Sequence, residues 1–531
     1  MNGTAKTVEQ GSGSVWRPLR IPIFRNLLIA NLVSDLGTFM QNVGAAWLMV
    51  SFGVGPAYVA LTQTASSLPF FFVAAVAGAV GDVVDRRKLV LFTETWMVLA
   101  SIAITVLTIF GAMSPWLLLA LTFALSAGDA FEAPSWRAIL PELVGNDDLA
   151  AASALNGIEF NFARAVGPAL AGLVIAAAGV SVAFTLNVLS FAGVLIVIAR
   201  WKRRPRKSSV PREKFTGAIV AGIRYIRFSP QIQYVMARQG ASMFFASGLL
   251  ALLPSLAHNI SKSATGYGLL LGLFGAGAVI GAVILQPLRS RWAVEAVVSG
   301  GVATVGLAMI MIGVVHTFFA IAPIMLAAGA AWICFVSLIS ALMQTLTPDW
   351  VRARVLAVFL LVFQGSVAVG SAVWGAVAQH VGVQTALLSA GLGTIASVGL
   401  ALMFRLPNTT ADLSPGIPWR IPLGGNLMIA NDSGPVLVTI EYTVPSERQH
   451  EFESYIQQYG RIRRRDGASR WEVFRDVENN ERYVEVFLVG SWAEHLRQHE
   501  RHTKADDELE SKIRQCVIGE IKVSHLIYTT G

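Results

Sequence analysis

The stretch GAVGDVVDRRKLVL, Gly78–Leu91, is a short charged interruption in an otherwise apolar part of the chain. The residues before it are almost entirely apolar from Ala57 onward, and the chain is apolar again from Leu89 to about Gly111. Each run is long enough for a helix that crosses ~30 Å of hydrocarbon, which takes ~20 residues. The interruption therefore predicts a turn in water between two membrane-spanning helices.

The composition of the whole chain is typical of a membrane protein. Of its 531 residues, 54% are hydrophobic and 14% are charged, whereas soluble proteins carry about 25% charged residues. The mean hydropathy is +0.58. From Ser433 to the end there are 14 basic and 17 acidic residues, and the rest of the chain has 27 and 16. The sequence therefore divides into a basic, apolar body and a water-soluble tail.

Neither a disulfide framework nor a cleaved signal peptide is expected. Cys334 lies in an apolar run and Cys516 lies in the tail, so the two thiols belong to different environments. The first twenty residues are polar and contain no apolar core followed by a small-residue cleavage site. We expect the first span itself to direct insertion.

Apolar runs of spanning length form two groups of six. The first group covers residues 24–50, 57–81, 89–112, 115–136, 149–178 and 181–201, and the second covers 232–256, 265–287, 293–315, 317–341, 354–379 and 383–404. Between them, Trp201–Lys214 is a basic linker, and Phe215–Phe228 has the pattern of an amphipathic surface helix. We expect an all-α polytopic membrane protein with 12 transmembrane helices in two six-helix halves. The expected divisions are 1–22 (tail), 23–201 (first half), 202–231 (linker), 232–405 (second half), 406–432 (linker) and 433–531 (C-terminal domain).

The distribution of basic residues predicts the orientation. Arg and Lys follow spans 2, 6, 8 and 10, for example at Arg86–Lys88 and Lys202–Lys214, whereas the connections after odd-numbered spans are short and nearly uncharged apart from Lys262. Basic loops stay in the cytoplasm. Both termini and the central linker are therefore expected to be cytoplasmic.

The tail has the pattern of a small α+β domain. Residues 434–444, 469–477, 482–491 and 520–528 have the pattern of strands, and 445–465 and 492–515 have the pattern of helices. The order βαββαβ predicts a ferredoxin-like sandwich.

Several motifs resemble the major facilitator superfamily. That superfamily carries a Gly-x-x-x-Asp-Arg-x-Gly-Arg-Arg-type signature between spans 2 and 3, matched here by a leading glycine, an acid and a basic run: Gly78, Asp82, Arg86, Arg87 and Lys88. Val83 and Asp85 depart from the signature, and the second departure is familiar from a subgroup of transmembrane secretion effectors that resembles the enterobactin exporter. The stretches 34–48, 163–172 and 347–358, and the tail segments 463–476 and 491–503, resemble the same subgroup. Physically, Asp82 could accept backbone N–H groups at a helix start, and the arginines could engage acids or helix C-termini on the facing half. The alternative is a plain positive-inside anchor.

Charged residues within spans are costly and are therefore candidates for function. They are Asp35, Glu94, Asp129, Glu132, Glu159, Arg164 and Arg238. We predict Asp35 and Glu132 as proton carriers, with Arg164 as a partner that resets their charge and Asp129 and Glu159 as further candidates. A static salt-bridge network at the inner gate is the alternative.

Polar and aromatic residues in the spans are candidates for a substrate cavity, although each could equally be a helix-packing residue. They are Gln41, Trp47, Asn156, Asn161, Gln239, Gln364 and Trp374. In the tail, His495, His499 and His502 fall at i, i+4 and i+7, a spacing that could hold Zn²⁺. The neighbouring charges favour a solvated helix instead, so no metal is predicted.

The resemblance implies a secondary transporter without a cofactor, in a bacterial cytoplasmic membrane. No Walker A pattern occurs, which disfavours transport driven by ATP hydrolysis on this chain. We expect a proton-coupled exporter of a small amphipathic metabolite, siderophore- or drug-like, and not an enzyme.

Alternatives are an importer or facilitator, or a membrane-tethered enzyme or sensor acting through the tail. The tail also resembles small dimeric domains of the antibiotic-biosynthesis monooxygenase type. The expected partners are the bilayer, a small-molecule substrate and protons, with dimerisation through the C-terminal domain as a further hypothesis. No nucleic acid is expected, because the basic run at 461–465 lies in a tail of net negative charge.

Overall fold

The computed structural model describes residues 16–83, 85–201, 215–407, 412–414, 416, 430 and 432–528, without the side chains of 74–83, 137–138, 146 and 215–219. The chain forms two compact units. The first consists of Met1–Ser209, Gln239–Ser337 and Leu360–Leu400, and the second of Val210–Arg238, Leu338–Phe359 and Ala401–Gly531. Three long helices contribute to both units: Pro230–Ser261, Phe318–Thr345 and Asp349–Val381.

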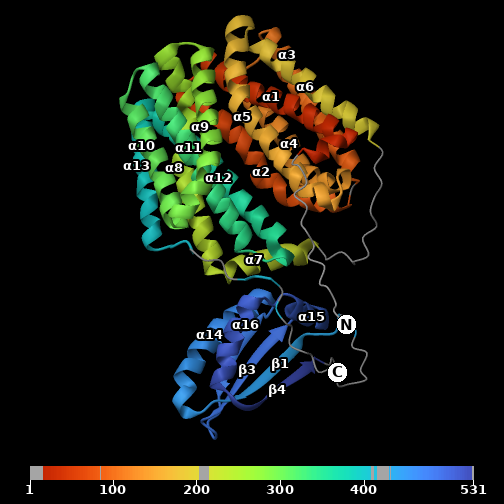
Figure 1. The fold of residues 1–531 in the computed structure, drawn as a ribbon. Coiled ribbons are helices and arrows are strands. Elements are labelled where there is room, and N and C mark those ends of the chain that lie inside the picture. Colours follow the sequence, from red (N-terminus) through yellow and green to blue (C-terminus); the bar gives the residue numbers. More distant parts are fainter. Residues whose placement is uncertain are drawn as a thin grey trace, which may run out of the picture. The chain divides into compact units, whose positions relative to one another are not determined.

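Twelve long helices occur in the described residues, in two groups of six (Figure 1). The first group, preceded by η1 (Arg17–Arg20), consists of α1 (Pro22–Ser51), α2 (Pro56–Val83), α3 (Arg86–Ile109), α4 (Pro115–Leu143), α5 (Leu149–Ala178) and α6 (Val180–Arg200), with η2 (Asn146–Asp148) before α5. The second consists of α8 (Pro230–Ser261), α9 (Ala264–Arg291), α10 (Val294–Val314), α11 (Phe318–Thr345), α12 (Asp349–Val381) and α13 (Val383–Val398), followed by η3 (Gly399–Leu402). The helix α7 (Phe215–Arg227) lies between the groups in sequence. The predicted fold class is confirmed.

Ten of these helices, all except α1 and α2, are long and apolar enough to cross a membrane, among the residues the structure describes. The connections between paired helices are short and are built alike in the two groups. Gly179 alone joins α5 to α6 and Gly382 alone joins α12 to α13, at φ of 88° and 85°. Only glycine adopts this backbone region without a steric cost, so the two equivalent turns require it.

The two groups of helices contact each other along α5 and α9, at the end of the bundle where α5 joins α6. Thr265 Oγ1 donates a hydrogen bond to the carbonyl of Gly172, at 3.3 Å. A methyl group on Gly268 would lie 2.6 Å from the carbonyl oxygen of Pro168, so the two backbones touch there. Small residues permit such an approach between membrane helices.

Proline shapes the same contact from the α5 side. Pro168 has no N–H to donate to the carbonyl of Arg164, four residues earlier. Gly275 of α9 packs against that carbonyl, since an added Cβ would lie 2.9 Å from its oxygen. Pro168, inside α5, therefore lies at a close contact between the two helices.

A second contact between the groups joins α2 to α12 at the same end. Thr64 Oγ1 donates to the carbonyl of Ala368 at 2.9 Å. A Cβ on Gly375 would lie 2.5 Å from Cβ of Ala60, and one on Gly365 would lie 3.0 Å from the ring of Phe71. The first half of α2 and the last half of α12 thus pack together, and the bundle is closed at this end.

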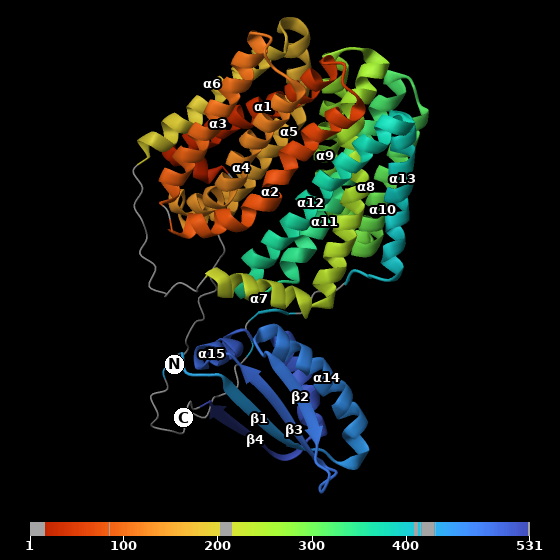
Figure 2. The same cartoon turned by 180° about the vertical axis from the view of Figure 1, so that it is seen from behind.

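The C-terminal domain has a four-stranded antiparallel sheet in the order β2-β3-β1-β4 (Figure 2). Its elements are β1 (Val436–Thr443), η4 (Ser446–Arg448), α14 (Gln449–Asp466), β2 (Arg470–Arg475), β3 (Arg482–Val489), α15 (Trp492–Glu500), α16 (Lys504–Cys516) and β4 (Ile518–Ile527). Alternate residues of β1 and β3 are buried, and with Phe452 and Ile456 of α14 they form the core. The predicted ferredoxin-like order is confirmed.

One prediction for this domain is wrong in detail. Residues 492–515 do not form a single helix, because Thr503 starts a new helix, α16, after α15 has ended. Thr503 and Asp506 make a capping box, in which Asp506 accepts the Thr503 N–H at 3.0 Å. Such a cap stabilises a helix N-terminus by about 1 kcal/mol and here sets the break.

We expect Gly268→Ala to destabilise the helix bundle by about 1–3 kcal/mol, because the added methyl group overlaps the backbone of α5. Thermal unfolding of the purified protein in detergent measures this effect. Gly300→Ala is the matched control, since a Cβ on Gly300 of α10 meets no atom within 4 Å. Equal unfolding temperatures for the two variants would contradict the close contact.

Candidate functional site

Five acidic side chains from four helices gather in the first group of helices. Asp35 is on α1, Glu94 on α3, Asp129 and Glu132 on α4, and Glu159 on α5. Glu94, Glu132 and Glu159 are buried, Asp35 is half-buried and Asp129 is exposed. Asp129 is close enough to Asp35, Glu94 and Glu132 for electrostatic repulsion. The structure thus brings together acids that are up to 124 residues apart in the chain.

The acids interact in pairs. The carboxyl groups of Asp35 and Glu159 lie within hydrogen-bonding reach of each other, as do those of Glu94 and Glu132. Thr93 Oγ1 also donates a hydrogen bond to Glu132 Oε2 at 2.8 Å. Two carboxyl groups can form a hydrogen bond with each other only when one of them carries a proton. The arrangement can therefore hold a shared proton between α1 and α5 and another between α3 and α4.

Arg164 does not join these acids. Its guanidinium lies 5.1 Å from the centre of the Phe160 ring, one turn away on α5. Among the described residues no salt bridge of Arg164 is found, and the ion pairs of this unit lie elsewhere. The expected partner that resets the charge of Asp35 or Glu132 is thus not in contact with either in this conformation.

The described part of the loop motif makes contacts within its own half. Arg86 Nη1 pairs with Glu142 Oε1 of α4 at 2.8 Å, and Arg87 Nε donates to the carbonyl of Ile198 at 3.0 Å. Asp85 caps α3 by accepting the N–H of Lys88 at 3.1 Å. A cation at the C-terminus of α6 is favourable because the helix dipole is negative there.

These contacts differ from the expectation that the arginines engage the facing half. Glu142, which pairs with Arg86, belongs to α4, and Ile198, which binds Arg87, belongs to α6, both in the first group of helices. The side chains of Gly78 and Asp82 lie outside the described residues. The gating role of the motif therefore stays a prediction.

The candidate cavity residues occupy different environments. Gln41 is buried in a polar network, where its Oε1 lies 3.5 Å from Asn187 Nδ2, and Asn187 donates to Ser101 at 3.1 Å. Trp47 packs edge-on against His258 of α8, with ring centres 5.7 Å apart, at the closed end. Asn161 donates to the Gly157 carbonyl of its own helix.

The remaining candidates are equally dispersed. Asn156 lines a small hollow beside Phe24, Asn31 and Trp136. Gln239 is fully buried, and neither of its amide atoms has a hydrogen-bond partner in the described chain. Gln364 is half-buried on α12, next to Gly365 at the contact with α2. The substrate-cavity role of the six residues therefore stays a prediction.

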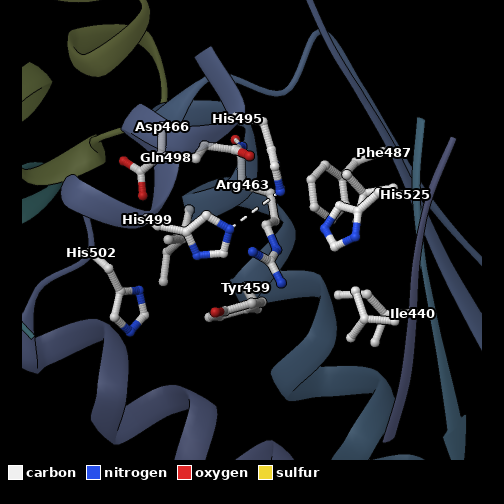
Figure 3. A pocket seen from close by; sticks show the side chains of 13 residues that line it. Ile440, Tyr459, Arg463, Asp466, Phe487, His495, Gln498, His499, His502 and His525 are labelled. Atoms are coloured by element: carbon white, nitrogen blue, oxygen red, sulfur yellow. Dashed lines mark hydrogen bonds between the residues drawn. The ribbon is translucent and has the colours of Figure 1, made fainter. Parts of the chain in front are cut away.

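The spacing of His495, His499 and His502 predicted that they share one face of a helix. The structure instead separates them into two groups. His495 and His499 lie on α15 with their Nε2 atoms 3.3 Å apart, inside a pocket that His525 of β4 also lines (Figure 3). His502 lies beyond the end of α15 and contacts Asp507 Oδ1 at 2.8 Å and Glu510 Oε2 at 3.5 Å. These last three are close enough for a metal ion, but Tyr459 and Arg514 also bind Glu510.

Burial controls the charge of the paired histidines. Desolvation, with the nearby His499, His525 and Arg463, lowers the pKa of His495 to about 3. Desolvation, with Arg463, His525 and His502, lowers the pKa of His499 to about 4. Both imidazoles are therefore neutral at physiological pH.

Sequence reasoning did not identify Thr93, Asn187 or the pocket residue Arg463 as functional candidates. Thr93 directly precedes Glu94 in an apolar run. A polar residue beside a charged one in such a run is the signal by which the sequence could have indicated Thr93. Arg463 belongs to the basic run at 461–465, which by itself does not indicate a pocket. Its direction toward the pocket depends on the packing of α14 against the sheet, as Figure 3 shows.

The two six-helix groups, with acids buried between helices, define a polytopic membrane transporter of the major facilitator type. Residues 13–530 match the family described as transmembrane secretion effector. The chain belongs to that family.

Comparisons with known proteins agree with this assignment. The enterobactin exporter EntS of Salmonella typhi is 26% identical over 398 residues, which are 72% of this chain and 92% of the relative. The EntS protein of Citrobacter koseri is 26% identical over 417 residues, 74% and 96% of the two chains. The fold is similar to the nucleoside transporter NupG, with a TM-score of 0.60 at 13% identity over 72% of this chain and all of that one. A bacterial homologue of the lysosomal transporter Spinster, solved inward-facing, has a TM-score of 0.56 at 12% identity, with 74% and 96% of the chains covered.

We expect the C-terminal domain to lose stability as the pH falls from 7.5 to 5. The unfolded chain binds protons at both histidines near pH 6.5, whereas the folded domain binds them only near pH 3–4, so unfolding takes up protons in this window. The loss is about 2 kcal/mol per histidine. Hydrogen exchange of the β1 amides in the full-length protein measures it.

The double variant His495→Gln/His499→Gln is the comparison for this measurement. Between pH 7.5 and 5, the stability of the variant should change by less than that of the wild type. The variant lacks the two histidines whose pKa is lowered most clearly, and the remaining groups, including Arg463 and His525, do not replace them. A pH profile that is identical in the two proteins would contradict the assignment.

Proposed function

We propose that the protein exports a small amphipathic metabolite, siderophore- or drug-like, in exchange for protons, and that both termini lie in the cytoplasm of a bacterial cell. The observation that carries this proposal is the set of paired carboxyl groups of α1, α3, α4 and α5, which have no basic partner among the described residues. The similarity to enterobactin exporters supports the direction and the substrate class. The positions of basic loops support the orientation.

The pairing of the acids suggests how protons act on the helices. When Asp35 and Glu159 share a proton, a hydrogen bond joins α1 to α5. Loss of that proton leaves two negative charges in a medium of low dielectric, where like charges repel strongly. Deprotonation should therefore drive α1 and α5 apart at this level.

The helix α5 connects the acids to the contact between the halves. Glu159 lies about one turn before Arg164, whose carbonyl packs against Gly275 of α9. A shift of α5 on deprotonation would be transmitted to the α5–α9 contact, which closes one end of the bundle. Transporters of this kind operate by rocking one half against the other around a central site.

The substrate site would then lie between the halves, beyond this contact. Gln239 and Gln364 of the second half remain candidates for contact with substrate. The exposed carboxyl of Asp129 adds a negative charge that could compete with an anionic or metal-chelating substrate for the same proton.

We expect Asp35→Asn to abolish proton-driven transport while leaving the protein folded, because asparagine keeps a hydrogen bond to Glu159 but carries no titratable proton. Uptake of enterobactin into inverted membrane vesicles with an imposed pH gradient measures the effect. Glu132→Gln should also reduce uptake by tenfold or more. Asp147→Asn, at an exposed acid before α5, is the control and should behave as wild type.

Unchanged uptake by Asp35→Asn would reject the coupling role of this residue. Uptake by the wild type that ignores the pH gradient would reject proton exchange altogether. Accumulation of enterobactin in the direction opposite to export in intact cells would favour an importer.

A further inference from the structure

The pocket of the C-terminal domain lies between the sheet and two helices. Val438, Ile440 and Val523 form an apolar wall on the sheet, and α14 and α15 supply the polar wall. The enclosed part of the hollow has a volume of about 40 Å³ and opens to solvent, and Figure 3 shows the polar side chains around it. Small-molecule sites combine an apolar surface with a few convergent polar groups, and this hollow has both.

Arg463 is the basic residue that lines the pocket, and the acidic lining residue, Asp466, is paired with Arg465. Its guanidinium lies 4.7 Å from the centres of both the Tyr459 and Phe487 rings, and its Nε donates to Glu485 Oε1 at 3.2 Å. Glu485 is fully buried and also accepts hydrogen bonds from Tyr442 and Trp471, which divide its charge. In the described part of the chain, the terminal nitrogens of Arg463 donate no hydrogen bond. They are therefore available to an anion.

Two polar atoms in the pocket wall have no partner although they are buried. His495 is 2% exposed and its Nδ1 makes no hydrogen bond, and Gln498 is 6% exposed and its Oε1 makes none. The two side chains lie close together, but these two atoms do not form a hydrogen bond with each other. An unpaired buried polar atom has lost its hydrogen bonds to water, so a molecule that accepts an N–H from an imidazole here gains affinity.

The charge of the pocket favours an anion over a metal ion. Arg463 helps to keep His495 and His499 neutral, and the same field would repel a divalent cation. Neutral imidazoles can donate N–H groups to a carboxylate. The sheet wall requires that the rest of the ligand be apolar.

The helix α15 has a second contact on its other side, within the same unit of the structure. Glu494 pairs with Arg224 of α7 at 2.9 Å and with Arg501 at 2.7 Å. Arg501 lies 4.6 Å from the ring of Trp350, in the first turn of α12, and donates to the backbone carbonyl of Asp466. Asp466 itself lines the pocket.

A second chain of contacts leads from Asp466 to α7. The Asp466 carboxylate binds Arg465 Nε at 2.7 Å, and the Arg465 guanidinium lies 5.5 Å from the ring of Tyr225. Tyr225 packs edge-on against Trp350, with ring centres 5.6 Å apart. The wall of the pocket and the contact with α7 and α12 therefore share Asp466 and α15.

We propose that this pocket binds a small organic carboxylate with an apolar body, and that its occupation alters the contact of α15 and Asp466 with α7 and the start of α12. The carboxylate pairs with the free edge of Arg463 and accepts an N–H from His495 or His499, while the apolar body lies on Val438, Ile440 and Val523. Binding at Arg463 and α15 changes the positions of Glu494 and Asp466. The site is thus a sensor of carboxylate metabolites attached to the helix that continues into the transporter.

The test uses the full-length protein in nanodiscs, with benzoate as the probe and benzamide as its uncharged equivalent. We expect benzoate to bind at least tenfold more tightly than benzamide by calorimetry. We expect Arg463→Gln to weaken benzoate at least tenfold and Arg461→Gln, an exposed arginine on the same helix, to leave it unchanged. Hydrogen exchange should show that benzoate alters the peptides of 220–228 and 347–353 in the wild type and not in Arg463→Gln.

Because Arg463→Gln leaves Glu485 without its cation, exchange of the β1 amides checks that the domain stays folded. If it unfolds, His499→Leu replaces it, with the same expected loss of benzoate affinity. Equal binding of benzoate and benzamide, or full benzoate binding by a folded pocket variant, would overturn the ligand assignment. Benzoate binding without any change at 220–228 and 347–353 would overturn the link to α7 and α12. Neither measurement requires transport, so these outcomes are independent of proton-driven export.

Discussion

The carboxyl groups of Asp35 and Glu159, and those of Glu94 and Glu132, approach each other inside an apolar helix bundle. An ionised carboxylate is expensive to bury without a cation, and two that touch are more expensive still. Arg164 lies on Phe160 instead, so in the proposed mechanism bound protons stabilise this arrangement. On that proposal, the positions of α1, α3, α4 and α5 depend on protonation, which is the property an exchanger of protons requires.

The contact between the two halves has the opposite character. It is built from backbone against backbone, with Gly268 on Pro168 and Gly275 on the Arg164 carbonyl, and it contains no charge. Such a contact is held by packing and a few hydrogen bonds, such as the one from Thr265 to Gly172, and it can separate without exposing an ion to lipid. The helix α5 carries both the acid Glu159 and this contact with α9. It can therefore couple proton binding to closure of the end of the bundle where α5 joins α6.

The C-terminal domain follows the rules of a soluble protein. Its core is apolar on one face of a four-stranded sheet, and its ion pairs are numerous, including Arg465 with Asp466 and Asp506. Side chains from such ion pairs also contact the helices: Glu494 pairs with Arg224 of α7, and Arg501 lies over the ring of Trp350. The C-terminal domain therefore contacts the helices through charges and aromatic rings.

The order of helices and strands was predictable from the sequence, because apolar length and alternation are local properties of the chain. The two groups of six spans, the surface helix at α7 and the βαββαβ order all followed from them, and the break at Thr503 was missed because a capping box is a weaker signal than helical spacing. The motif that begins at Gly78 likewise indicated a charged turn, whereas the partners of Arg86 and Arg87, Glu142 and the end of α6, came only from the tertiary structure. The same is true of the acid pairs, of the position of Arg164 and of the direction in which Arg463 points.

A sequence determines which residues must leave water, since that depends on each side chain and its neighbours along the chain. Which of them then meet is decided by helix packing, since Asp35 and Glu159 are 124 residues apart and their carboxyl groups approach each other only when α1 and α5 are in place.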